Sequence, residues 1–320
     1  MSERRRVNVN TGVKVGVFVA GLCVVFGAAA AIGNVVGPVD SEPAAMDHAD
    51  DDAMTDMPGM SEGGDEPPGG LQVAQNGYRF VLDEPDQEAA DPALVSFTIL
   101  APNGRPLTDY ATLHDKKLHF IVAKRDLSGF QHVHPTLDEH GTWTARIALT
   151  PGPWRAFADF DPAGKDPQLT LGADLSVAGD FAATPLPEPS RTATVGDYTV
   201  TLDGDAEAGA QSKLTLTVTK DGKPVTDLQP YLAAYGHLVA LRDGDLAYLH
   251  VHPDGEPGDG TTKPGPRITF HAAFPSEGSY RLYLDFKHGG VVRTAEFTVE
   301  AGTSASTGEA DAHDDSEHGH

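Results

Sequence analysis

The sequence predicts an all-β chain that folds into two tandem β-sandwiches. Short segments with alternating apolar and polar residues recur through residues 75–300 and are separated by turn residues. The chain contains 35 Gly and 24 Pro, a composition that favours many turns over long helices. Roughly seven strands per ~100 residues is the density of an immunoglobulin-like sandwich, and two such sets follow one another along the chain.

Seven strands are expected in each sandwich. In the first, over residues 75–182, they lie at 78–82, 93–100, 117–124, 130–135, 142–149, 154–160 and 169–177. In the second, over residues 192–300, they lie at 198–202, 213–219, 236–242, 247–253, 267–274, 280–286 and 292–299. The Pro-rich segment 183–191 joins the two sandwiches, and Trp154 and Tyr280 are expected in their cores.

The N-terminal region predicts a membrane anchor. Residues 15–37 carry no charge, and as a helix rising ~1.5 Å per residue they are long enough to cross a bilayer core of ~30 Å. Arginines and Lys14 precede this segment, so residues 1–14 are expected in the cytoplasm and the rest of the chain outside it. The alternative is a signal peptide that is cleaved near Ala28–Ala30, which would leave a secreted protein.

Acidic segments flank the predicted sandwiches. Residues 38–74 and 301–320 are rich in small and acidic residues, and we expect a disordered stalk and a disordered tail. The formal net charge of the chain is -24, which argues against a nucleic-acid-binding protein. The single cysteine, Cys23, excludes a disulfide scaffold and a multi-cysteine zinc site.

The two halves of the predicted β region repeat a pattern of histidines. His119, His132 and His134 of the first half recur 118 positions later. Their counterparts are His237, His250 and His252. A second pair, Asp159 and Asp285, lies on the expected sixth strand of each sandwich, beside the third. Imidazole is the commonest protein ligand of zinc and copper, so both triads are candidate metal ligands, and each aspartate is a fourth ligand or orients a histidine.

The spacing of the histidines suggests that they converge. Residues i and i+2 of a strand share a face, so His250 and His252 point the same way. A two-residue turn at Asp243–Gly244 would pair strands so that the numbers of opposite residues add up to 487, which places His237 across from His250. The first triad has the same separation and a less decisive turn. Whether the two triads form separate sites or meet between the sandwiches stays open. His114, His140 and His288 lack repeat partners, and we expect them in solvent; His271 is expected to be structural.

Further metal-binding residues are expected in the acidic flanks. The candidates in the stalk are Met46, His48, Met54, Met57 and Met60. Thioethers are soft ligands that favour Cu(I), and methionine is also tolerated in any disordered segment. The tail contributes His313, His318 and His320 as an auxiliary, low-affinity set, for which a merely solvated acidic end is the alternative.

The second predicted sandwich resembles a bacterial family of membrane-linked or secreted β-sandwich proteins, described as heavy-metal-binding or copper-resistance associated. The residues that carry the resemblance are Tyr231, Leu232, Gly236, His237, His250, His252, Pro253, Phe274, Pro275, Gly278 and Tyr280. The first sandwich keeps the three histidines but lacks the Tyr-Leu and Gly-His pairs. The resemblance implies metal handling and names no reaction.

Together these observations predict an extracytoplasmic, membrane-anchored protein that binds a transition metal, copper first and zinc as the alternative. Its role would be buffering, storage or delivery, with a membrane metal transporter or another extracytoplasmic metal protein as partner. A tandem interaction module that needs no metal is the main alternative. We expect no enzyme, because the sequence contains neither an HExxH motif nor a G-x-S-x-G motif, although three histidines would also suit a mononuclear metal enzyme.

Overall fold

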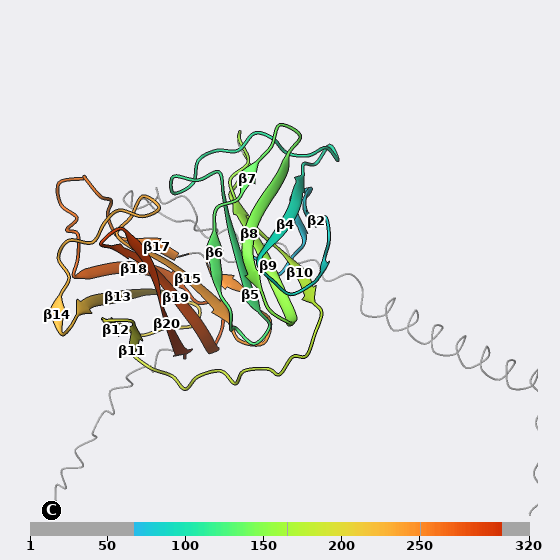
Figure 1. Ribbon diagram of the computed structural model, residues 1–320. Coiled ribbons are helices and arrows are strands. Elements are labelled where there is room, and N and C mark those ends of the chain that lie inside the picture. Colours follow the sequence, from blue (N-terminus) through green and yellow to red (C-terminus); the bar gives the residue numbers. More distant parts are fainter. Residues whose placement is uncertain (1–66, 165, 250, 303–320) are drawn as a thin grey trace, which may run out of the picture. The chain divides into compact units, whose positions relative to one another are not determined.

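The computed structural model describes residues 67–164, 166–249 and 251–302 (Figure 1). Most of the expected stalk, the expected anchor at 15–37, the auxiliary methionines and histidines, and His250 lie outside these residues. Within the described ranges, no helix has the length and apolar character needed to cross a membrane. All the regular elements in them are strands, which confirms the all-β prediction.

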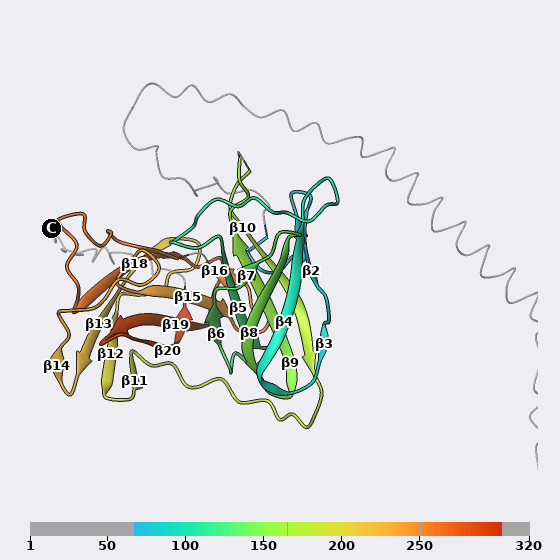
Figure 2. The ribbon, with the colours of Figure 1, turned by 45° about the horizontal axis from the view of Figure 1, so that its top comes forward.

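The first sandwich consists of two five-stranded sheets, with the strand orders β1-β2-β4-β8-β7 and β3-β10-β9-β5-β6 (Figure 2). All the neighbours pair antiparallel except β3 and β10, which are parallel. The strands are β1 (Ala74–Gln75), β2 (Tyr78–Leu82), β3 (Asp86–Gln87), β4 (Ala90–Leu100), β5 (Leu118–Lys124), β6 (Gln131–Val133), β7 (Thr136–Leu137), β8 (Thr142–Leu149), β9 (Gly152–Phe160) and β10 (Leu169–Val177).

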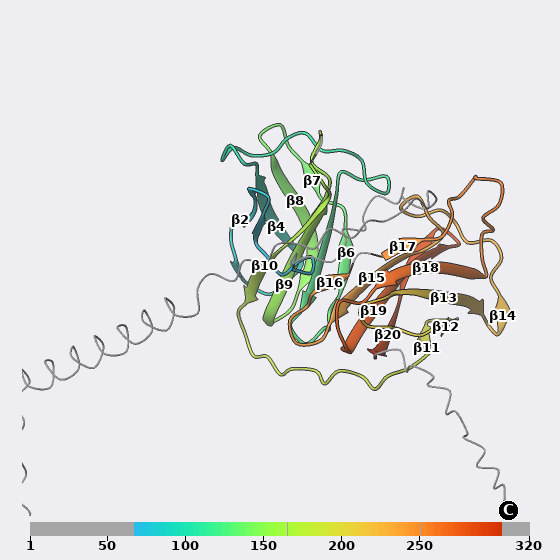
Figure 3. The ribbon, with the colours of Figure 1, turned by 180° about the vertical axis from the view of Figure 1, so that it is seen from behind.

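The second sandwich also consists of two sheets. One has the order β11-β12-β13-β18-β17, with β14 added to β13, and the other has the order β16-β15-β19-β20 (Figure 3). The strands are β11 (Thr192–Val195), β12 (Tyr198–Asp203), β13 (Gln211–Lys220), β14 (Lys223–Pro224), β15 (His237–Arg242), β16 (Tyr248–Leu249), β17 (Val251–Pro253), β18 (Arg267–Ala273), β19 (Gly278–His288) and β20 (Val291–Ala301).

Each sandwich has its own apolar core between its two sheets. Strands β4 and β8 of the first sandwich and β13 and β18 of the second show the alternating burial of strands with one face on a core. Trp154 and Tyr280 are buried in the two cores, as expected from the sequence. Each Å² of apolar surface that is buried stabilises the fold by about 25 cal/mol, and this burial is the main force that holds such layers together.

The folded region begins before residue 75. Gly69 pairs with Tyr248, and the amide of Gly70 donates to the carbonyl of Thr170. The buried guanidinium of Arg155 donates to the carbonyls of Gly70 and Leu71. Residues 69–71 therefore belong to the folded unit, and the predicted stalk boundary at residue 74 is too late. The sequence contained no strand pattern there, because backbone groups make these contacts.

A third apolar cluster lies between the two sandwiches. It contains Ile121, Ala123, Leu127, Phe157, Val239, Leu241, Leu246, Tyr248 and Tyr283, and we call it the inter-sandwich cluster. Strands β5 and β15 are buried on both faces, since alternate residues point into their own core and into this cluster. His119 precedes Ile121 on the outward face of β5, and His237 precedes Val239 on the outward face of β15.

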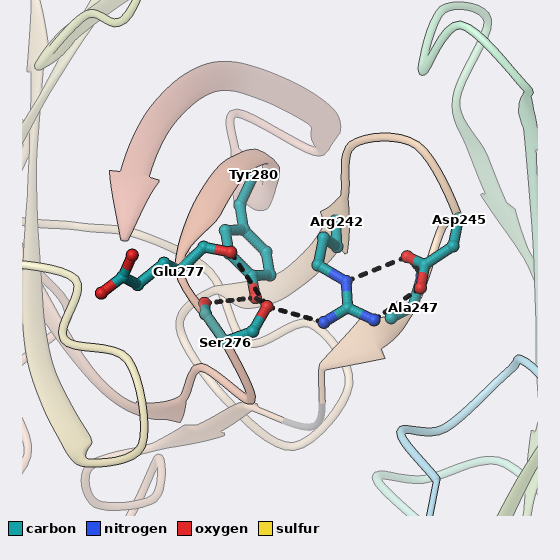
Figure 4. A network of polar contacts seen from close by, with 6 residues as sticks. All are labelled: Arg242, Asp245, Ala247, Ser276, Glu277 and Tyr280. Atoms are coloured by element: carbon teal, nitrogen blue, oxygen red, sulfur yellow. Dashed lines mark hydrogen bonds and ion pairs between the residues drawn. The ribbon is translucent and has the colours of Figure 1, made fainter. Parts of the chain in front are cut away.

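The register of the second hairpin differs from the prediction by two residues. Ala240 pairs with Leu249, so the numbers of opposite residues add up to 489 instead of 487. In the first hairpin, His132 pairs with Ile121 and not with His119. The reason in the second hairpin is a longer turn. Arg242 binds the Asp245 carboxylate and the Ser276 hydroxyl, as Figure 4 shows, and Leu246 takes a left-handed conformation that buries its side chain in the inter-sandwich cluster. A shift of two positions preserves the face on which each side chain lies.

Candidate metal centre

Three histidines of the first sandwich come together beside the β5–β6 hairpin. His119 lies on β5, His132 lies on β6, and His134 directly follows β6. Nδ1 of His119 is 3.0 Å from Nε2 of His132 and 3.3 Å from Nε2 of His134. One ring nitrogen from each residue lies within 4.8 Å of the other two, which is a spacing that a single metal ion can bridge.

Two residues of the second sandwich reach the same place. His237 on β15 is directly opposite Asp285 on β19, just as His119 on β5 is opposite Asp159 on β9. This pairing confirms the prediction that the sixth strand of each sandwich neighbours the third. Oδ2 of Asp285 is 3.0 Å from Nδ1 of His132, and its Oδ1 accepts a hydrogen bond from Thr294. Asp285, His132 and His237 thus form a second group within 4.8 Å.

The first triad therefore lies beside one member of the second triad, His237, and beside Asp285. His132 belongs to the first triad and contacts Asp285 of the second sandwich, and its ring centre is 4.8 Å from that of His237. The rings of His119 and His237 stack at 5.5 Å. We call His119, His132, His134, His237 and Asp285 the histidine centre.

The hydrogen bonds of the histidine centre determine where its protons lie. Nε2 of His119 is 3.0 Å from the carbonyl oxygen of Leu113, which can only accept, so Nε2 carries the proton and Nδ1 carries a lone pair. The Asp285 carboxylate can only accept, so Nδ1 of His132 donates to it, and in the neutral ring Nε2 then carries a lone pair. These two lone pairs face each other at 3.0 Å. A cation between them would convert this repulsion into attraction.

Burial favours the neutral form of His119, His134 and His237. His119 has no exposed surface, and burial, followed by the neighbouring His132, lowers its pKa to about 4. Burial likewise lowers the pKa of His134 to about 3, and lowers the pKa of His237 well below the ordinary value. A protonated imidazolium cannot coordinate a metal, so near pH 7 these three rings are ready to bind without first losing a proton.

His237 also has an unsatisfied atom. Its side chain is buried with 8% of its surface exposed, and Nδ1 has no hydrogen-bond partner among the described residues. A buried polar nitrogen without a partner is destabilising by about 1–3 kcal/mol, so most such atoms in native proteins have one. A metal ion is one group that would satisfy it.

His114 is a member of this neighbourhood that the sequence did not reveal. Its ring centre is 5.9 Å from that of His119 and 5.7 Å from that of His237, so the expectation of a solvated side chain was wrong. It lies in the irregular segment before β5 and has no counterpart in the repeat, which is why no pattern indicated it. The expectation that His288 lies in solvent was also wrong, because its ring contacts the Tyr198 hydroxyl and Asp227.

The remaining predicted ligands lie elsewhere. His252 is exposed and pairs in register with His271 of β18, in the other sheet of its sandwich. Asp159 accepts hydrogen bonds on Oδ1 from Gln168 and Thr170. Neither residue belongs to a metal-compatible group within the described part of the chain. The expected convergence of His237 with His250 and His252 involves a residue outside the described ranges.

A groove gives solvent access to the histidine centre. It has a volume of about 620 Å³, and its lining includes His134, Lys116, Lys117 and Asp138. The other four members of the centre do not line it. An ion from solvent would therefore meet His134 first.

The comparisons with known proteins identify a family. A family described as a domain of unknown function, DUF8832, matches residues 72–176 and again residues 193–303. These two matches coincide with the two sandwiches. A comparison with curated proteins found no match.

Solved structures with a similar fold include bacterial adhesins. FdeC, an adhesin of Escherichia coli, is 16% identical with a TM-score of 0.24, and the match covers 72% of this chain and 65% of FdeC. InvE, an adhesin of Yersinia pseudotuberculosis, is 14% identical with a TM-score of 0.22, and the match covers 74% of this chain and 61% of InvE. The chain thus spans less than two thirds of these proteins, and the likeness concerns their fold.

Proposed function

Because this chain belongs to the DUF8832 family, whose description names no activity, we propose a function from its own residues: it binds a transition metal ion at the histidine centre. The observation that carries the proposal is the lone-pair conflict between His119 Nδ1 and His132 Nε2, which are 3.0 Å apart. When both rings are neutral, their acceptor-only partners, Leu113 and Asp285, leave a lone pair on each of these two facing nitrogens. A metal ion bound between the two nitrogens would be attracted by both lone pairs.

The donor set favours copper first and zinc second. It consists of imidazole nitrogens and one carboxylate, which suit both metals, and the Irving–Williams order gives Cu²⁺ the higher affinity at a given site. Three protein ligands with a fourth position for water or a further ligand are usual for zinc sites that are open to solvent molecules or substrates. Water or a further ligand would reach that fourth position through the groove beside His134.

We further propose where the protein acts. The sequence features of residues 1–37 support an extracytoplasmic protein that is tethered by an N-terminal helix or secreted after signal cleavage. A metal-binding pair of immunoglobulin-like sandwiches in that position would buffer or store the ion, or deliver it to a transporter or to another metal protein. A carrier accounts for these features without a catalytic step, so we do not propose an enzyme.

The second candidate is an interaction module. The adhesins among the similar structures agree with tandem sandwiches that present protein-binding surfaces, and in this respect the comparisons agree with the module better than with metal binding. Because the likeness concerns the fold alone, our first proposal is based on the histidine centre. The two functions make opposite predictions for histidine substitutions, since only metal binding requires the imidazoles.

The test uses the full chain without an affinity tag. Metal-free protein is dialysed against Cu²⁺ or Zn²⁺, and the bound metal is counted by mass spectrometry for the wild type and for a His119→Gln, His132→Gln double variant. We expect the double variant to lose the tightest-binding metal. His140→Ala is the matched control, because this histidine is exposed and contacts only its neighbour Glu139 among the described ion pairs. Equal metal content in the wild type and the double variant would refute the proposal and favour the interaction module.

A further inference from the structure

His132 offers its two ring nitrogens to two different ligand groups. Nε2 lies 3.0 Å from Nδ1 of His119, and Nδ1 lies 3.0 Å from Oδ2 of Asp285. The two nitrogens of an imidazole point away from each other in the ring plane, so one ion cannot bind both. His132 is nevertheless a member of both metal-compatible groups.

Each group is sufficient for an ion by itself. The first group supplies three imidazole nitrogens, from His119, His132 and His134. The second supplies His132, His237 and the Asp285 carboxylate, and it contains the buried His237 whose Nδ1 lacks a partner among the described residues. Three protein ligands with an open position are enough for zinc, and imidazole with carboxylate also suits copper.

We propose that the histidine centre binds two metal ions, bridged by the imidazole ring of His132. This inference rests on the proposed function. One ion lies among His119, His132 and His134, and the other lies among His132, His237 and Asp285. When both nitrogens of His132 coordinate, the one ring proton of neutral His132 is released to solvent, and the ring becomes a bridging imidazolate.

The charges in the second group suit this arrangement. Two nearby divalent cations repel each other, and repulsion is strong in a buried site. The negative imidazolate lies between the two ions, and the Asp285 carboxylate, which is 3% exposed, adds a second negative charge. No Lys or Arg side chain forms an ion pair with Asp285 among the described residues, so its charge is free to offset a metal ion.

A two-ion centre would also join the sandwiches. His119, His132 and His134 come from the first, whereas His237 and Asp285 come from the second. The bridging ring would therefore link an ion bound by one sandwich alone to an ion bound by both.

The test counts copper and unpaired electrons on the same sample. The full chain carries His313→Ala, His318→Ala and His320→Ala, which removes the tail histidines as a background. Copper per chain is measured after loading with Cu²⁺ alone, and the spins are counted by electron paramagnetic resonance. Two Cu²⁺ ions that share an imidazolate are exchange-coupled, so we expect two coppers but a spin count well below two.

The variants separate the two halves of the centre. Asp285→Asn keeps the side-chain shape and the acceptor for Thr294, and it should lose one copper and restore a full spin count for the other. His134→Ala should lose the other copper. Asp159→Asn is the matched control at the equivalent position of the repeat and should change neither count. His237→Gln repeats the Asp285 test, and circular dichroism checks the folding of every variant.

Each outcome bears on the inference. If the wild type binds one copper and either Asp285→Asn or His134→Ala alone abolishes it, the centre holds one ion. The inference then fails while the proposed function stands. Two coppers with a full spin count would overturn the bridge. If neither variant changes the copper count, both the inference and the proposed function fail.

Discussion

The metal-free protein should lose stability on mild acidification because of His119. Its pKa is about 4 in the folded protein, whereas the ordinary value is 6.5. Between these values the unfolded chain binds a proton that the folded protein excludes. The free energy of unfolding therefore falls as the pH drops through this window, and it is fully recovered above about pH 6.5.

The size of this effect follows from the difference in pKa. Between about pH 7.5 and about pH 4.5, His119 alone should reduce the free energy of unfolding by roughly 2–3 kcal/mol. His134, whose pKa is about 3, adds a loss of the same sign. Most domains are stable by only about 5–15 kcal/mol, so the combined change is easily measured.

The assay is urea unfolding with EDTA at both pH values, for the wild type and for His119→Gln. Acidification also protonates carboxylates and relieves the repulsion within a chain of net charge -24, which acts in the opposite direction. The difference between the two proteins removes this common contribution. His119→Gln should lower stability at about pH 7.5 through lost packing, and its further loss at about pH 4.5 should be smaller than that of the wild type by about 2 kcal/mol.

His140→Gln serves as the control, because its side chain is 79% exposed. If the wild type and His119→Gln lose equal stability on acidification, His119 is not a buried neutral imidazole. The assignment of its protons, and with it the reasoning for a cation site, would then be wrong.

Three further predictions concern the contacts around the histidine centre. Tyr283→Phe removes a buried hydroxyl that donates to the Leu127 carbonyl between the sandwiches; it should destabilise the protein by about 1–3 kcal/mol in urea unfolding, and an unchanged midpoint would mean that the carbonyl finds another donor. Gly172→Ala places a methyl group 2.0 Å from the Gly70 carbonyl oxygen, so we expect the free energy of unfolding in urea to fall by roughly 3 kcal/mol. The control is Gly302→Ala, whose surroundings are open, and it should change the free energy of unfolding by no more than about 0.5 kcal/mol. Stripping metal from the loaded wild type with EDTA should lower the thermal midpoint by roughly 5–10 °C, since ligand at 100 times its Kd stabilises by about 2.7 kcal/mol; the His132→Gln variant should show little change, and an equal shift in both proteins would place the responsible metal elsewhere.

The sequence by itself determined the local chemistry of this protein. The repeated histidines, the strand pattern and the period of two residues placed His119 and His132 on one face of a hairpin, and an error of two residues in register did not change that face. The pairing of the third and sixth strands likewise brought Asp285 opposite His237. These features depend on pairing within one hairpin or one sheet, which the strand pattern of the sequence indicates.

Only the tertiary structure decided that the first triad shares one centre with His237 and Asp285 of the second sandwich. The apolar runs around Ile121 and Val239 indicate strands that are buried on both faces, but they do not say what covers the outer face. The contact of His132 with Asp285, and the inclusion of His114, depend on how the outer faces of β5 and β15 pack against each other. That packing is determined by the shapes of side chains that are distant in sequence, such as Leu127, Leu246 and Tyr283. Hydrophobic burial is non-directional, so the sequence pattern of a strand does not specify which surface covers its outer face.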